Sequence, residues 1–109
     1  MISQRTVLSL CQYLDLQGAT DIRILFEKHG LQFQPGDGAH IQRIHLSLSR
    51  GTAQQFESVL EEIVRTEGYF ADKVCGWPFE QVAAYKQRWQ DLVFCLELDG
   101  YRVFDQKLI

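Results

Sequence analysis

Apolar residues recur at intervals of three and four positions through most of the chain, which is the spacing of one face of an α-helix. The longest such segment spans residues 78–100. Pro78 suits the first position of a helix, and Gly100 offers the left-handed conformation that commonly closes one. One wide apolar stripe consists of Val82, Tyr85, Trp89, Leu92, Val93 and Leu96. This stripe must be buried against other segments, so we expect Trp89 and Leu92 to be nearly fully buried.

Two shorter helices are predicted near the beginning of the chain. Ser3 is a suitable N-cap for the first. Its apolar stripe comprises Val7, Leu8, Leu10, Cys11 and Leu14. The second is expected to be capped by Thr20 or Asp21 and to stop at Gly30. Its inward face comprises Ile22, Leu25 and Phe26.

Residues 39–49 follow a loop rich in glycine and proline and allow two interpretations. Ile41, Ile44 and Leu48 have helical spacing. Ile44, Leu46 and Leu48 alternate with polar residues as in a strand. No similarly alternating segment lies nearby to pair with such a strand, so the helix is favoured.

The next helix is marked by the capping box of Thr52 and Gln55 and is expected to end at Gly68. Its outer face carries Arg65 and four acidic residues, Glu57, Glu61, Glu62 and Glu67. Such a face is most simply solvated, although it could also meet a basic partner.

Together these segments predict an all-α fold for a single helical domain over residues 1–109, a compact bundle of about five helices. Residues 69–77 form the most irregular and most aromatic connection. Residues 101–109 form either a short C-terminal β-hairpin or an extended tail.

Composition is that of an ordinary globular domain, with 46% hydrophobic and 23% charged residues. Residues 1–54 carry five basic and four acidic groups, a net +1, whereas residues 55–109 carry six and ten, a net −4. Duplex nucleic acid is therefore not an expected partner, since its phosphates require a concentrated basic stripe. No apolar stretch approaches the ~18–20 residues that span a bilayer, so no membrane association is expected.

The three cysteines Cys11, Cys75 and Cys95 are widely separated and odd in number. The chain has no CxxC pair and no secretory signal, which indicates reduced thiols and a cytoplasmic protein. Cys11 and Cys95 fall among apolar neighbours at helical spacing. We expect both to be core residues.

No catalytic, metal or cofactor motif is present in the sequence. His29, His40 and His45 lack the short paired spacing of a zinc site, and no cofactor is expected. Arg23 and His29 have an R-x5-H spacing that resembles the signature of HEPN ribonucleases, in which such residues cut RNA at a dimer interface. The polar residue that follows the arginine in that family is replaced here by Ile24. A HEPN-like ribonuclease is the alternative to a non-enzymatic function.

Three segments resemble the small all-helical N-terminal and effector-associated domains of bacterial abortive-infection proteins of the AbiJ type. They are ISQRT at residues 2–6, LFEKHGL at residues 25–31 and DLVFCLELDGY at residues 91–101. The resemblance implies a module that mediates association, either as the N-terminal part of an antiphage defence effector or as its partner. It carries no catalytic residue with it.

The function expected on this basis is protein–protein interaction, as an adaptor or oligomerisation domain, with a protein partner or a second copy of the chain. Exposed aromatic residues are the side chains that such a surface favours. The candidate interaction surface consists of Tyr69, Phe70, Trp77 and Phe79. We expect at least one of the four to stay accessible.

Overall fold

The computed structural model describes residues 2–33, 38–65, 76–104 and 107–109. These residues form five α-helices followed by a two-stranded antiparallel sheet. The elements are α1 (Gln4–Leu14), α2 (Ala19–Lys28), α3 (His40–Arg50), α4 (Ala53–Arg65), α5 (Phe79–Leu98), β1 (Val103–Phe104) and β2 (Lys107–Leu108). The predicted helical fold is confirmed, residues 40–50 are helical, and the C-terminal segment forms the hairpin.

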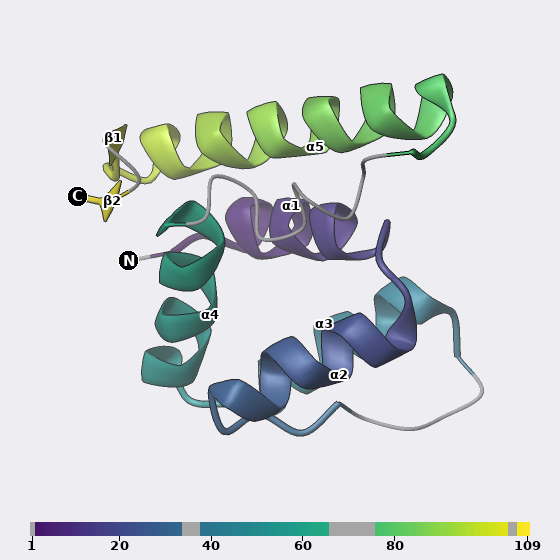
Figure 1. The fold of residues 1–109 in the computed structure, drawn as a ribbon. Helices are drawn as coiled ribbons and strands as arrows, with labels where there is room; N and C mark the ends of the chain where they lie inside the picture. Colours follow the sequence, from purple (N-terminus) through teal and green to yellow (C-terminus); the bar gives the residue numbers. More distant parts are fainter. Residues whose placement is uncertain (1, 34–37, 66–75, 105–106) are drawn as a thin grey trace.

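The helices are stacked, with α5 as the outermost one (Figure 1). α1 lies directly beneath α5, α2 and α3 lie below α1, and α4 runs across the stack on the side where the hairpin is found. The main contacts of α1 are with α5 and α3, so α1 is the central helix. The radius of gyration is 13.2 Å, which agrees with the roughly 13 Å expected of a compact chain of about this length.

The core is built around α1 and confirms part of the predicted burial. Its largest fully buried side chains are Tyr13, Phe26, Leu10, Leu14, Ile22, Leu25, Ile44, Leu60, Ile63, Leu92 and Leu96. Leu92 is buried as expected, but Trp89 is only partly buried. Three helical positions separate the two residues, which turns Trp89 about 60° away from Leu92 toward the edge of the interface.

Two sequence predictions about α1 and α2 are wrong. Leu8 is exposed because it lies about 160° around α1 from the buried Leu10. α2 begins at Ala19 after an N-cap at Gly18, which has no capping side chain. Asp21 instead lies in the first turn, where its negative charge suits the helix dipole.

Most helix ends follow the expected caps. The Ser3 hydroxyl accepts a hydrogen bond from the N–H of Thr6. In the capping box before α4, the N–H of Gln55 donates to the Thr52 hydroxyl at 3.1 Å, and the N–H of Thr52 donates to Gln55 Oε1 at 2.9 Å. Pro78 is the N-cap of α5 rather than its first helical residue. The predicted helix end at Gly68 lies outside the described residues.

Gly100 closes α5 in the left-handed conformation expected of it, with φ 91°. The N–H of Tyr101 donates to the carbonyl of Leu96 at 2.9 Å, and the N–H of Gly100 donates to that of Glu97 at 3.0 Å. This pair of bonds is a Schellman motif, and it turns the chain directly from α5 into the hairpin.

The hairpin packs one side against the bundle. Val103 pairs with Leu108, and these two side chains are partly buried against the core, where β2 contacts α4. Phe104 pairs with Lys107 and is exposed, as is Ile109. Within the described residues, no helix combines the length and the apolar character needed to cross a membrane.

Candidate functional site

The predicted aromatic surface is described only in part. Tyr69 and Phe70 lie outside the described residues. Trp77 is partly buried just before α5, whereas Phe79, the first residue of α5, is 85% exposed. Phe79 meets the expectation that at least one of the four stays accessible. An aromatic side chain exposed to this degree points to the N-terminal end of α5 as a candidate contact region.

Phe79 belongs to a larger exposed face that follows the whole length of α5. We call it the α5 outer face, and it consists of Phe79, Glu80, Ala83, Lys86, Gln87, Gln90, Phe94, Glu97 and Leu98. Phe94 is 60% exposed and Leu98 is 51% exposed. At 100° per residue all nine positions fall within an arc of about 120°, so they form one continuous surface.

Phe94 and Leu98 were not among the residues that the sequence singled out. The signal that could have found them is their position relative to the apolar stripe. Phe94 lies about 160° around the helix from the buried Leu92, on the side opposite the core. A large apolar residue on that side has no core to enter, and it therefore marks a surface.

The opposite face of α5 fixes the orientation of the outer face. Tyr85, Leu92, Cys95 and Leu96 are its buried residues. The hydroxyl of Tyr13 in α1 donates to the hydroxyl of Tyr85 at 3.0 Å, and the Tyr13 ring lies 5.8 Å from that of Trp89. The main contacts of α5 with other described elements are with α1 and β1, and the residues of its outer face are exposed.

Asp99 fastens the C-terminal end of α5 to the start of α1. Its carboxylate accepts hydrogen bonds from the backbone N–H of Ser3 and from the hydroxyl of Thr6, and Arg5 lies 3.3 Å away. These bonds, that from the Ser3 N–H foremost, lower the pKa of Asp99 from 3.8 to about 2. Asp99 is therefore ionised at neutral pH and holds α1 and α5 together.

A second polar cluster surrounds Glu62 and corrects the prediction of a fully solvated acidic face on α4. The Glu62 side chain is only 6% exposed. His29 Nε2 lies 3.1 Å from its carboxylate, Lys28 Nζ lies 3.3 Å away, and Arg65 lies 3.8 Å away. Glu62 is buried because the end of α2 brings Lys28 and His29 onto this part of α4.

His29 of this cluster is also one of the two residues, with Arg23, on which the ribonuclease alternative depends. His29 is the C-cap of α2 and contacts Glu62, while Arg23 is exposed on the same helix. Six positions separate them, which turns their side chains about 120° apart around the helix axis. Within one chain, Arg23 and His29 are therefore not brought together.

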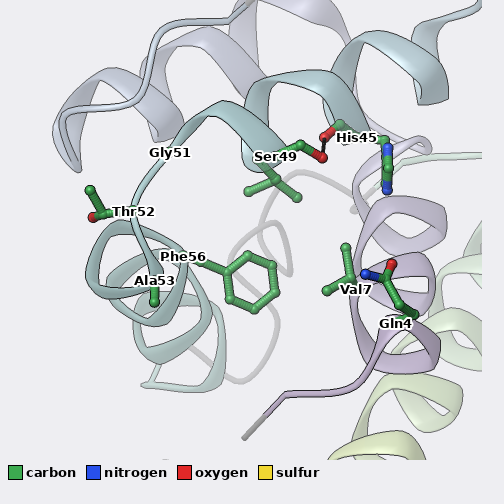
Figure 2. Close-up of a pocket in the computed structure, with 9 residues that line it drawn as sticks. Gln4, Val7, His45, Ser49, Gly51, Thr52, Ala53 and Phe56 are labelled. Atoms are coloured by element: carbon green, nitrogen blue, oxygen red, sulfur yellow. Dashed lines mark hydrogen bonds between the residues drawn. The ribbon is translucent and has the colours of Figure 1, made fainter.

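A shallow pocket of about 300 Å³ lies between α1, α3 and α4 (Figure 2). Phe56 from α4 and Val7 from α1 point toward each other across it, and His45 and Gln4 lie together at one end. His45 is the only titratable group among the nine residues drawn. The pocket is at the lower end of the roughly 300–1,000 Å³ typical of ligand clefts, and it offers one apolar depression with a polar edge.

Of the remaining histidines, His40 contacts the backbone of the segment before α2. His40 Nε2 lies 2.7 Å from the backbone carbonyl of Gln17. In the part of the chain that the structure describes, no three His, Cys, Asp or Glu residues gather as they would around a metal ion.

The two described cysteines are buried, as predicted. Burial, followed by the nearby charge of Asp15, raises the pKa of the Cys11 thiol to about 12. The thiol is therefore protonated at neutral pH and a poor nucleophile. Cys75 lies outside the described residues.

Comparison of the chain with protein-family models, with curated proteins and with solved structures finds no significant match.

Proposed function

We propose that this chain is a protein–protein interaction module, acting as an adaptor or oligomerisation domain in a bacterial antiphage defence system. It would form the N-terminal part of an effector protein or bind to one. The observation that carries the interaction is the α5 outer face, on which Phe79, Phe94 and Leu98 are each more than half exposed. Complete burial of a large apolar side chain is favourable by about 1.5–3 kcal/mol, so a partner that covers these side chains would gain binding free energy.

The composition of this face supports binding. Its apolar side chains are separated by Glu80, Lys86 and Glu97. Aromatic anchors surrounded by polar groups are typical of protein interfaces, in which a few large side chains provide most of the binding free energy.

The defence context is supported by the resemblance to abortive-infection domains. Two of the three segments that carry it, residues 2–6 and 91–101, contact each other in the fold. Ser3 and Thr6 of the first segment both hydrogen-bond to Asp99 of the second. The resembling residues thus cooperate in holding α5 in place.

Site-specific photo-crosslinking in bacterial cells that carry the gene tests the proposal. A photoreactive amino acid is introduced in place of Phe94 and, as a matched control, in place of Leu46, an exposed residue on α3. We expect phage-infected cells to yield a protein adduct at position 94 and none at position 46. The absence of any adduct at position 94, or equal yields at both positions, would overturn the interaction function.

The defence context is tested separately by counting plaques. Phe94→Ser should lower the protection that the intact gene gives against phage, while leaving the amount of folded protein unchanged. Equal plaque counts with and without the gene would remove the defence assignment and leave the interaction function standing.

A further inference from the structure

We propose that the α5 outer face binds the same face of a second copy of this chain, with the two helices antiparallel about a two-fold axis level with the midpoint between Arg88 and Trp89. This inference rests on the proposed interaction function and names its partner. It is carried by the order of side chains along the outer face.

The outer face contains the spacing by which helices pair side by side. Along this face, residues recur at alternating intervals of three and four positions, which is the spacing of a coiled-coil seam. These residues are Glu80, Ala83, Gln87, Gln90, Phe94 and Glu97. All six are exposed, so the seam has no partner among the helices that the structure describes.

The seam is complementary to itself when it is reversed. Ala83 and Phe94 are equally far from the midpoint of α5, so an antiparallel two-fold pairing brings Phe94 of each copy level with Ala83 of the other. The two residues lie within about 20° of one another around the helix, and both therefore face the partner helix. The largest side chain of the seam then meets the smallest, twice, as an isologous interface requires. A parallel pairing would place Phe94 against Phe94 and Ala83 against Ala83.

The polar residues of the seam fit the same arrangement. Gln87 and Gln90 are also equally far from the midpoint and become level with one another across the pair. The Nε2 group of Gln87 donates to Asp91 within its own helix at 2.9 Å, which leaves its carbonyl oxygen to accept a hydrogen bond from Gln90 of the second copy. A polar pair at the centre of a helical seam fixes its register. Glu80 and Glu97 are level too, but they lie about 100° apart around the helix, on opposite sides of the seam.

The size of the face sets the strength of the dimer. A helix of 20 residues is about 30 Å long and about 10–12 Å across, so the pairing covers a strip of roughly 300–360 Å² on each chain. Standard interfaces bury about 800 Å² on each partner. We therefore expect a weak dimer with a Kd in the micromolar range.

Exchange of the two facing side chains tests the pairing. Sedimentation equilibrium measures dimerisation of the intact chain and of Phe94→Ala, Ala83→Phe and the double variant that carries both changes. Each single change should weaken the dimer by about tenfold or more, whereas the double variant should restore it because a phenylalanine again faces an alanine. Leu46→Ala on α3 is the control and should have no effect.

All these positions are exposed, so circular dichroism should show the same helical content in each variant. A monomeric intact chain at every concentration, or a double variant as weak as the single ones, would overturn the self-pairing. If the chain is monomeric while crosslinking at position 94 captures a protein of another mass, only the self-pairing is wrong. If position 94 captures nothing, the interaction function is wrong as well.

A spin label at position 97 tests the direction of the helices. The label is attached to Glu97→Cys in a chain that also carries Cys75→Ser, with Cys11 and Cys95 protected by burial. In the antiparallel dimer the two labels should be on the order of 25–30 Å apart, given 17 positions between residues 80 and 97 and a rise of about 1.5 Å each. Strong broadening from labels about 10 Å apart would indicate parallel helices and contradict the proposal.

Discussion

The carboxylate of Asp99 accepts hydrogen bonds from both the backbone N–H and the hydroxyl of Ser3, at 2.9 and 3.0 Å, across 96 positions of sequence. Ser3 is the N-cap residue of α1, so one side chain at the end of α5 is hydrogen-bonded to the start of α1. The α5 outer face is held in its orientation from below by the Tyr13–Tyr85 contact and at one end by this contact.

Acid should destabilise the protein through Asp99. Its pKa is lowered from 3.8 to about 2 in the folded state, so its stabilisation is complete above 3.8 and is lost as the pH falls through 2. We expect Asp99→Asn to lower the Tm at neutral pH and to show a smaller further loss of Tm than the intact chain between these two pH values. Thermal melts followed by circular dichroism measure this, and parallel curves for the two proteins would argue against the role of Asp99.

Gly100→Val should destabilise the fold because φ at this position is 91°. No atom lies within 4 Å of an added Cβ, so the cost is that of the backbone conformation, about 1–2 kcal/mol. Gly100→Asn is the matched control. Asparagine tolerates the left-handed conformation better than a β-branched residue, so this change should cost clearly less than Gly100→Val. Urea melts that show no difference between the two variants would contradict the assignment.

Leu92→Ala should lower the free energy of unfolding by about 2–5 kcal/mol, because Leu92 is fully buried between α5 and the core. Trp89→Ala should fall at the lower end of the roughly 3–5 kcal/mol lost for buried tryptophan, since part of the ring is exposed. Equilibrium unfolding in urea gives both values. A loss below about 1 kcal/mol for Leu92→Ala, the range of surface changes, would place this residue outside the core.

Phe79→Ser should leave the free energy of unfolding within about 0.5 kcal/mol of that of the intact chain, because Phe79 is 85% exposed. Its effect should instead appear as weaker association. Sedimentation equilibrium and a urea melt on the same sample separate the two effects. A large loss of stability with unchanged association would show that Phe79 belongs to the fold and not to the interface.

The sequence predicted helix ends wherever a side chain or a glycine marks them. Ser3, the Thr52–Gln55 box, Gly30 and Gly100 are local signals, and the structure uses all of them. The start of α2 was mispredicted because Gly18 caps the helix with its backbone alone. Glycine is also accepted at an N-cap, but without a side chain it gives a weaker signal there than Thr20 or Asp21.

Burial was less predictable than helix position because it depends on contacts between distant segments. Glu62 is covered because the end of α2 reaches α4, which the spacing of residues in α4 does not reveal. Phe94 is exposed because no described segment packs over its side of α5. α5 is the outermost of the described helices, and its main contacts with described elements are with α1 and β1. Phe79 was identified because it is one of four aromatic residues within eleven positions, in the most irregular connection of the sequence.

The packing of α1 against α5 also bears on how fast the protein folds. Helical bundles usually fold quickly because most of their contacts are local in sequence. Here the Ser3–Asp99 bonds span 96 positions, and they form only after a long loop has closed at a cost in chain entropy. α5 should therefore dock late, onto an assembly of the earlier helices. Docking of the last helix onto the first should then be the slowest step of folding, while the mainly local contacts of the bundle keep its folding faster than that of a protein rich in long-range sheet contacts.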